Sequence, residues 1–137
     1  FTKQVLQGLV YLHEKGVVHR DIKGGNILSD GAGNVKLADF GASKHIKNIP
    51  LANLGNSEIC KSIKGSLYWM APELFKQEDH GRKIDIWSLG CTIIEMATAC
   101  HPWPDCRSYP ELALAIMTKK CPPIPDHLSE NAQDFIR

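Results

Sequence analysis

The sequence predicts a mainly α-helical fold that contains one small β-hairpin. Apolar residues recur at helical spacing near the start of the chain, and the apolar run at residues 84–98 is long enough for a helix inside a core. Two short segments, 26–28 and 35–37, carry apolar residues on either side of a cluster of turn formers, which is typical of a hairpin. With 43% hydrophobic residues, a chain of 137 residues can bury a core of its own.

Residues 1–15, before the hairpin, predict an amphipathic helix. Leu6, Leu9 and their apolar neighbours recur at helical spacing, and Gly16 follows at a position where helices commonly end. A pair of valines then leads into a polar loop. After the hairpin, residues 41–66 show no periodicity, and unstructured loops of this length are usually functional. We therefore expect residues 41–66 to form a regulated loop.

The second half of the chain predicts three helices. Residues 84–98 are apolar on nearly all sides, which favours a helix in the middle of the core. A second helix is expected over residues 110–119, with Pro110 in its first turn. Prolines separate it from a third helix, which is expected to begin near Asn131.

Charge and hydropathy exclude two classes of partner. Sixteen Lys and Arg against fifteen Asp and Glu leave a net charge of +1, too balanced for the broad basic field of most nucleic-acid or membrane-surface binders. The longest apolar stretch is interrupted by Asp85 and Glu95, and no basic segment followed by an apolar run opens the chain. We therefore predict no nucleic-acid partner, no signal peptide and no membrane span.

The cysteines predict a reducing compartment. Their number is odd, and they lack the paired Cys-x-x-Cys spacing of structural zinc sites. Free thiols and a cytoplasmic location are therefore expected. The five cysteines are Cys60, Cys91, Cys100, Cys106 and Cys121.

Three short motifs carry the strongest signal for function. Residues 19–26 read HRDIKGGN and fit the pattern H-R-D-x-K-x-x-N, for which a chance match in a chain this short is about one in ten thousand or rarer. Residues 39–41 read DFG after the predicted hairpin, and residues 71–73 read APE at the end of the long loop. In this order the three motifs resemble those of eukaryotic protein kinases.

The resemblance implies that residues 1–137 are a partial protein kinase domain with the fold of its C-terminal lobe. The N-terminal lobe is absent, because the Gly-rich loop, the strand Lys and the helix Glu of the family do not occur in the sequence. We therefore expect the isolated chain to be inactive. The implied segments are a catalytic loop (19–26), a magnesium loop (39–41), an activation segment (39–73) and a buried core helix (about 84–98).

The resemblance also implies ATP and Mg²⁺ as cofactors. Asp39 and Asn26 would hold magnesium through oxygen atoms, which suits a hard cation. Lys23 would contact ATP and neutralise charge on the transferring phosphoryl group, and Asp21 would accept the proton of the substrate hydroxyl. Asp21 has an ordinary pKa near ~3.9, so orienting the hydroxyl is expected to matter more than strong deprotonation. Leu28 is expected in the core from its apolar neighbours, and the resemblance makes it part of the floor under adenine.

Further residues are expected to support the site. By resemblance, His19 would pack beneath Phe40, and the hydroxyl of Ser66 would bridge Asp21 and Lys23. Ser66 stands where the family commonly has Thr, so it keeps the hydroxyl group and loses the methyl group. Ser66 is therefore expected to position the substrate.

Two acidic residues are assigned structural roles. By resemblance, Asp85 would accept hydrogen bonds from backbone amides of the catalytic loop, with capping of its own helix as the alternative. Glu73 would pair in the family with an Arg that lies beyond residue 137. We therefore expect Glu73 to carry a buried unpaired charge here, and breaking such a pair typically costs about 3–5 kcal/mol.

Substrate class follows from the catalytic loop and its surroundings. Lys23, two residues after Asp21, is the pattern of the serine/threonine kinases. Residues 37–44 and 64–70 look most like those of mitogen-activated protein kinase kinase kinases. The resemblance therefore implies a signalling cascade, with a mitogen-activated protein kinase kinase as the protein substrate.

Arg20 is the expected point of regulation. In kinases with an Arg directly before the catalytic Asp, this Arg binds a phosphate added to the activation segment. Ser57 and Ser62 are the candidate acceptors, and the phosphate would pair with Arg20 and Lys44. The alternative is that these serines only keep the loop soluble.

A function of a different class is an alternative. The chain could be a catalytically inactive kinase-like module that docks substrates, or acts as a dominant negative, through residues 68–70 and 110–119. A degenerate module has no need to keep all the catalytic residues together, which favours the enzyme. The retained residues are Asp21, Lys23, Asn26 and Asp39.

Overall fold

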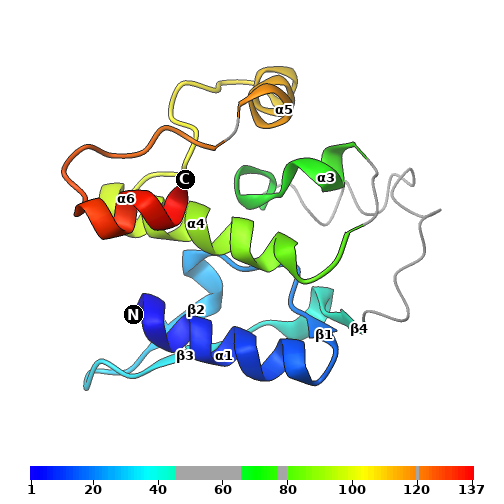
Figure 1. Ribbon diagram of the computed structural model, residues 1–137, viewed down its shortest axis with the longest axis vertical. Coiled ribbons are helices and arrows are strands. Elements are labelled where there is room, and N and C mark those ends of the chain that lie inside the picture. Colours follow the sequence, from blue (N-terminus) through cyan, green and yellow to red (C-terminus); the bar gives the residue numbers. More distant parts are fainter. Residues whose placement is uncertain (46–65, 77–79, 120) are drawn as a thin grey trace.

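The structure, a computed structural model, is mainly helical, as the sequence predicts (Figure 1). It describes residues 1–45, 66–76, 80–119 and 121–137. The α-helices of these ranges are α1 (Thr2–Glu14), α3 (Pro72–Phe75), α4 (Lys83–Thr98), α5 (Tyr109–Thr118) and α6 (Glu130–Ile136).

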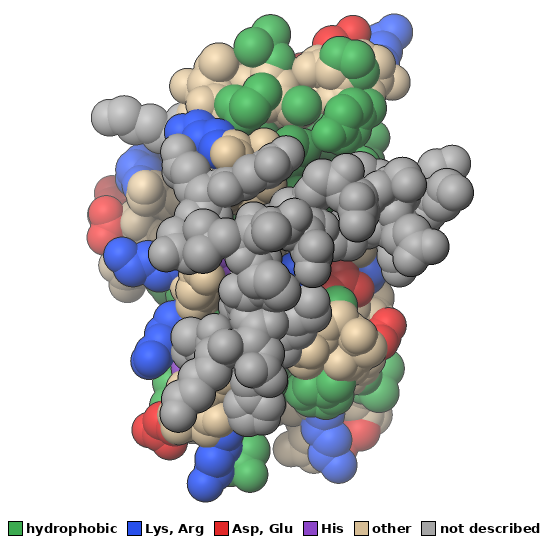
Figure 2. All heavy atoms as spheres, turned by 90° about the vertical axis from the view of Figure 1, so that its right-hand side faces the viewer, with side chains coloured by type: hydrophobic (Ala, Val, Ile, Leu, Met, Phe, Trp, Pro, Cys, Tyr) green, Lys and Arg blue, Asp and Glu red, His purple; other side chains and the backbone are tan. Residues whose placement is uncertain are grey.

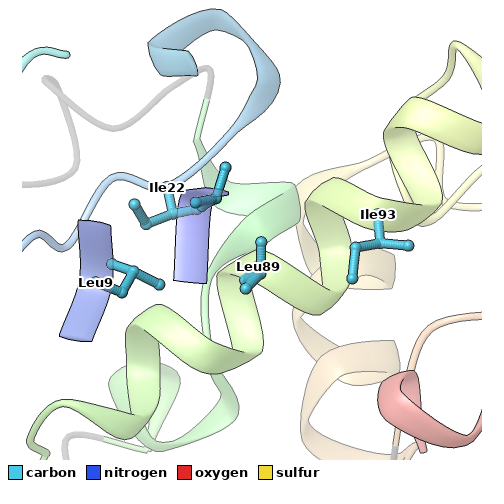
Figure 3. Packing of buried hydrophobic residues seen from close by; sticks show 5 residues of the cluster. Leu9, Ile22, Leu89 and Ile93 are labelled. Atoms are coloured by element: carbon cyan, nitrogen blue, oxygen red, sulfur yellow. The ribbon is translucent and has the colours of Figure 1, made fainter. Parts of the chain in front are cut away.

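Helix α4 runs through the middle of the molecule, with α1 on one side and α3 and α5 on the other (Figure 1). Figure 3 shows Leu9 of α1 and Ile22 of the catalytic loop beside Leu89 and Ile93 of α4. Leu9, Ile22 and Leu89 are at most 1% exposed. The helix expected over residues 84–98 is therefore present and forms the centre of the core.

Two further apolar clusters lie along α4. Trp87 packs against both of them, so this helix joins the region around Val18 and Ala71 to helix α5. Helix α5 also carries the exposed residues Tyr109, Leu114 and Met117, and Figure 2 shows hydrophobic side chains gathered at the end of the molecule where α5 lies. The buried members of the two clusters are Val18, Ala71 and Ile84 in one, and Trp103, Leu112 and Ile116 in the other.

The predicted hairpin is formed by β2 (Ile27–Ser29) and β3 (Val35–Leu37). The strands are antiparallel, with Ile27 opposite Leu37. Asp30 closes the turn, because its carboxylate accepts backbone hydrogen bonds of 2.9 and 2.8 Å from two residues of the turn.

A second two-stranded sheet corrects the expectation of a single hairpin. Strand β1 (Val17–Val18) pairs antiparallel with β4 (Lys44–His45). Strands of two residues are too short to show the alternation that identifies a strand in a sequence. The sheet joins the start of the catalytic loop to the residues that follow the magnesium loop.

The hairpin packs against α1. Gly8 lets β3 approach the helix closely, since a Cβ atom there would lie 3.1 Å from Cδ1 of Leu37. Ile27, Val35 and Leu37 pack against the core cluster. Leu28 is 59% exposed, so the expectation that it lies in the core is wrong. Successive residues of a strand point to opposite faces, and only one face of this hairpin is covered.

The last two helices begin at serine caps. Ser108 accepts a hydrogen bond from the third residue of α5, and Pro110 occupies the first turn of that helix. Ser129 caps α6 in the same way. Both helices lie within one residue of the positions that the prolines and periodicity predict.

Candidate active site

The catalytic loop connects β1 to β2 and is anchored by one apolar side chain. Ile22 is fully buried against α1 and α4. Its neighbours Asp21 and Lys23 are only partly buried. A short 3₁₀ turn, η1 (Gly24–Asn26), completes the loop. Burial of Ile22 therefore fixes the two polar residues on either side of it at the surface.

Asp85 fixes the start of the catalytic loop to α4. Its side chain is fully buried, and its two oxygens accept hydrogen bonds from the backbone N–H groups of His19 at 2.9 Å and Arg20 at 2.8 Å. Nε2 of His13 lies 2.7 Å from one of these oxygens. The contact with backbone amides of the catalytic loop is therefore the one expected. The capping alternative is wrong, because the N-cap of α4 is Arg82 and no side chain caps the helix.

Four polar side chains form one connected group. Nζ of Lys23 lies 2.9 Å from Oδ2 of Asp21 and donates a hydrogen bond of 2.7 Å to Oγ of Ser66. Nδ2 of Asn26 donates to the backbone oxygen of Asp21 at 2.7 Å and to its Oδ2 at 2.8 Å. The structure therefore brings Asp21, Lys23, Asn26 and Ser66 together across 43 residues of sequence between Lys23 and Ser66.

These contacts keep Asp21 ionised. Burial alone would raise the pKa of its carboxyl group. Hydrogen bonds from Ser66, Lys23 and Asn26, together with the positive charge of Lys23, lower the pKa of Asp21 below its ordinary value. Asp21 is therefore an acceptor of hydrogen bonds near neutral pH and a poor proton acceptor.

The hairpin places Asp39 near Asn26. The backbone N–H of Ala38 donates to the carbonyl oxygen of Asn26 at 2.9 Å, which extends the strand ladder by one step. Asp39 follows directly, in the left-handed conformation with a φ of 60°. Asp and Asn adopt this conformation more readily than other non-glycine residues. The sharp turn separates Asp39 from the strand it follows.

The oxygen atoms of Asn26 and Asp39 fit a magnesium ion. Asp21 uses the amide nitrogen of Asn26, so the amide oxygen is the atom left for a ligand. The carboxylate of Asp39 accepts a bond of 3.2 Å from the N–H of Gly41. No group of three or more metal-binding side chains of His, Cys, Asp or Glu occurs in the described ranges. An amide oxygen and a carboxylate are oxygen donors of the type that suits Mg²⁺, which binds through one or two carboxylates together with substrate phosphates.

His19 packs against the residues on either side of Asp39 in the magnesium loop. Its ring is fully buried, and its Nε2 lies 3.2 Å from the backbone oxygen of Ala38. The ring centroids of His19 and Phe40 are 5.0 Å apart and tilted by 54°. Phe40 itself is 49% exposed. His19 therefore contacts both the strand end and the aromatic residue that flank Asp39.

Arg20 adopts a strained backbone conformation, with a φ of 72°. The bond from its N–H to Asp85 holds it there. Burial lowers the pKa of Arg20, and the charge of Asp85 opposes this effect. Among the described residues, its guanidinium group forms no ion pair. The predicted phosphate acceptors Ser57 and Ser62 lie outside the described residues.

Glu73 departs from the expected buried charge. It lies in the first turn of α3 and is only partly buried. Its carboxylate has no ion-pair partner within the described part of the chain. Partial exposure to water therefore reduces the cost of leaving it unpaired.

Two polar residues near the catalytic loop, His13 and Glu95, were not among the predicted site residues. Glu95 accepts hydrogen bonds from both the catalytic loop and the activation segment. His13 contacts Asp85, as described above. A signal existed for Glu95, which like Asp85 interrupts an apolar helix. No comparable signal existed for His13, which lies at the end of an amphipathic helix.

Composition also predicted free thiols and no membrane span. The described cysteines, Cys91, Cys100, Cys106 and Cys121, are free, and Cys60 lies outside the described residues. Burial raises the pKa of the Cys91 thiol far above its usual range. Within the described ranges, no helix is long and apolar enough to cross a membrane.

Comparison with known proteins identifies the family. The model of the protein kinase domain matches residues 1–137. Mitogen-activated protein kinase kinase kinase 3 of Mus musculus is 46% identical over 137 residues, which cover 100% of this chain and 21% of the relative. The kinase kinase kinase YODA of Arabidopsis thaliana is 50% identical over 140 residues, covering 100% of this chain and 15% of the relative.

A third relative, mitogen-activated protein kinase kinase kinase A of Dictyostelium discoideum, is 50% identical over 137 residues. The chain spans about a fifth or less of the length of these relatives, between 14% and 21%. The resemblance inferred from the three motifs is confirmed by these matches. The chain therefore belongs to the protein kinase family, in which it resembles the mitogen-activated protein kinase kinase kinases along its whole length.

Proposed function

We propose that this chain is the C-terminal lobe of a kinase that phosphorylates serine or threonine in protein substrates. The observation that carries the proposal is the connected group of Asp21, Lys23, Asn26 and Ser66. Each of these side chains contacts another member of the group, so the positions of a hydrogen-bond acceptor, a cation and a metal ligand are fixed together. A docking module without catalysis would have no need for this arrangement.

Asp21 orients the substrate hydroxyl. Its lowered pKa makes it a weak base, so it accepts a hydrogen bond from the hydroxyl and aligns the oxygen with the phosphorus atom. Lys23 holds its ammonium group beside this carboxylate and supplies positive charge where negative charge develops during transfer. Ser66 fixes the position of that ammonium group through the bond of 2.7 Å.

Mg²⁺-ATP would supply the phosphoryl group, and the metal would neutralise charge on its phosphates. Asn26 and Asp39 would hold the metal through their oxygen atoms. Leu28 and Phe40 are exposed next to these residues. Leu28 forms part of the floor under adenine, which explains why an apolar side chain on β2 lies uncovered.

Catalysis requires an N-terminal lobe in addition to these residues. A Gly-rich loop and a strand Lys that hold the phosphates do not occur in the 137 residues. The chain alone therefore binds Mg²⁺-ATP weakly and does not turn over. Calorimetry on the chain checks this, and tight magnesium-dependent binding of ATP would contradict it.

The substrate is a mitogen-activated protein kinase kinase, and the cascade is cytoplasmic. Three relatives whose names describe them as mitogen-activated protein kinase kinase kinases support this substrate class. The balanced charge of +1 supports a protein partner in preference to a nucleic acid or a membrane surface.

The proposal is tested in a chimera in which this chain replaces the matching 137-residue segment of the mouse kinase kinase kinase 3. The chimera should phosphorylate a kinase kinase substrate, and Asp21→Asn should reduce kcat by about 10³-fold or more, because it removes the oriented acceptor. A folded chimera without activity would instead favour the docking or dominant-negative module. Activity that survives Asp21→Asn would remove Asp21 from the mechanism.

Arg20 provides a site for regulation. Its guanidinium group forms no ion pair in the described ranges, and a phosphate on the activation segment would supply an anion that pairs with this group. Combined Ser57→Ala and Ser62→Ala substitutions in the chimera should lower kinase activity, whereas the exposed Ser29→Ala should not. We would abandon this regulatory role if the double variant were as active as the parent.

A further inference from the structure

Glu95 is a carboxylate of α4 that the proposed mechanism does not use. Glu95 is partly buried, and it lies in a helix that is mostly apolar. Its Oε2 atom accepts two hydrogen bonds of 2.9 Å, one from the backbone N–H of Gly24 and one from the indole Nε1–H of Trp69. The two donors, at positions 24 and 69, come from segments that are far apart in sequence. One oxygen atom therefore joins the catalytic loop to the activation segment.

The first donor lies between two residues of the site. Gly24 follows Lys23 directly and begins the 3₁₀ turn η1 that ends at Asn26. A hydrogen bond to the N–H of Gly24 therefore fixes the peptide group that links Lys23 to Gly24. The same bond fixes the first residue of the turn that carries Asn26.

The fit at Gly24 is tight. A Cβ atom built on Gly24 would lie 2.6 Å from Oε1 of Glu95, a distance that real Cβ contacts essentially never show. A Cβ atom on Gly25 would meet nothing within 4 Å. A side chain at position 24 would therefore displace the carboxylate of Glu95, whereas one at position 25 would not.

The second donor lies three residues after Ser66. Trp69 ends the short 3₁₀ turn η4 (Leu67–Trp69), whose N-cap is Ser66. Helix α4 also holds the backbone of Trp69, because Oγ of Ser88 donates to its carbonyl oxygen at 2.8 Å. Helix α4 therefore fixes both the indole ring and the carbonyl group of Trp69. The turn η4 connects Trp69 to Ser66, whose hydroxyl group contacts Lys23.

We propose that Glu95 is a positioning residue that sets the spacing between Lys23 and Ser66. The inference rests on the proposed function, because it concerns the same site. A carboxylate oxygen shared by two N–H donors makes strong hydrogen bonds, and a shift of a catalytic group by about 1 Å can reduce a rate by about 10²-fold. Glu95 joins the catalytic loop to the activation segment through Gly24 and Trp69, and the hydrogen bond between Lys23 and Ser66 joins the same two segments a second time.

The kinetic test compares Glu95→Met with Glu95→Gln in the chimera described above. Methionine keeps the length of the side chain and removes both acceptors, whereas the amide oxygen of glutamine can still accept both bonds. We expect kcat per folded active site to fall about ten- to a hundredfold in Glu95→Met, with the KM for ATP within about twofold of the parent. Glu95→Gln should recover most of the loss.

Two outcomes would overturn the positioning role. One is a Glu95→Met enzyme that keeps the parental kcat. The other is a Glu95→Gln enzyme as slow as Glu95→Met, because hydrogen bonding would then not explain the effect. A merely structural role would lower the melting temperature and the folded fraction of both variants without separating kcat from KM.

Gly24 and Gly31 provide a matched pair of positions for testing the same hydrogen bonds. Gly24→Ala should displace the Glu95 carboxylate and lower kcat, whereas Gly31→Ala, in the exposed hairpin turn where a Cβ atom meets nothing within 4 Å, should leave kcat near the parental value. Trp69→Phe keeps an aromatic ring and removes the indole donor, so it should lower kcat less than Glu95→Met does. Equal kcat values for the two alanine variants would count against the role of Glu95.

A measurement on the 137-residue chain separates this inference from the proposed function. An inactive parental chimera would contradict the proposed function and leave the hydrogen bonds of Glu95 to be tested directly. Amide and indole hydrogen exchange, followed by NMR, should show faster exchange at Gly24 and Trp69 in Glu95→Met than in the parent chain. Unchanged exchange at both positions would overturn the inference whether or not the chimera is active.

Discussion

The candidate site has a proposed substrate side and a proposed nucleotide side, and the two differ in how far their side chains are supported by the rest of the described chain. On the side proposed to meet the substrate, Asp21, Lys23 and Ser66 are joined by hydrogen bonds, and α4 supports the loop that carries two of them. On the side proposed to meet the nucleotide, Leu28 is 59% exposed and Phe40 is 49% exposed. The polar side chains of the first side contact one another, whereas the apolar side chains of the second are in contact with water.

This difference concerns how each side of the candidate site is supported by the core. Exposed apolar side chains beside polar ligands are typical of a surface that binds a partner or a ligand. The residues proposed to orient the substrate hydroxyl therefore depend on the core around α4, whereas Leu28 and Phe40, proposed for the nucleotide side, are largely uncovered by the described chain. Substitutions on the two sides should accordingly affect different properties.

The largest contrast in stability is expected between a core leucine packed against the catalytic loop, Leu89, and an exposed leucine of β2, Leu28. Leu89→Ala should lower the free energy of unfolding by about 2–5 kcal/mol, because Leu89 is fully buried against α1 and the catalytic loop. Leu28→Ala should change it by less than about 0.5 kcal/mol, since most of this side chain is exposed. Urea unfolding of the chain measures both values. Similar losses of unfolding free energy in the two variants would show that Leu89 supports the structure no more than Leu28 does.

Asp85→Asn tests the support beneath the substrate side. Each oxygen of Asp85 accepts a different backbone N–H, so an amide nitrogen in its place must face one of these donors. We expect a loss of about 1–3 kcal/mol in the free energy of unfolding. The matched control is the exposed Asp105→Asn, which should be nearly neutral. Equal losses for both variants would argue against the contacts of Asp85 with the loop.

The elements of the fold that sequence could predict are those with long periodic patterns or strong breakers. The helix at residues 84–98 and the hairpin around Asp30 are of this kind. The sheet of β1 and β4 could not be predicted, because two-residue strands carry no periodicity and their pairing depends on tertiary structure. Leu28 was placed in the core because the sequence does not show which face of a two-stranded hairpin is covered.

The candidate site was predictable where a motif fixed residue types at a constant spacing. Asp21, Lys23 and Asn26 lie within six residues and were identified together. Glu95 was missed, because its two donors come from distant segments and become its neighbours only after folding. A lone carboxylate in an apolar helix is a signal that a buried or partly buried donor must lie nearby.

Ser66 tests the link between the catalytic loop and the activation segment. Ser66→Ala in the chimera should lower kcat by about tenfold or less, because Lys23 and Asp21 each lose one hydrogen bond. Ser66→Thr keeps the hydroxyl group and should retain most of the activity. A Ser66→Thr enzyme as slow as Ser66→Ala would show that the hydroxyl group is not the feature that matters.

The smallest effect is expected in the acid dependence of stability. Folding lowers the pKa of Asp21, so its contribution to stability is fully present above the ordinary carboxyl pKa of about 3.9 and is lost as the pH falls through the lowered pKa. The parent chain should therefore lose more unfolding free energy than Asp21→Asn between about pH 5 and pH 2. Lys23→Met should reduce this difference, because it removes both a hydrogen bond to Asp21 and the nearby positive charge. Denaturant unfolding across this pH range measures the effect, and parallel curves for the parent and Asp21→Asn would show that the contacts of Asp21 do not stabilise its ionised form.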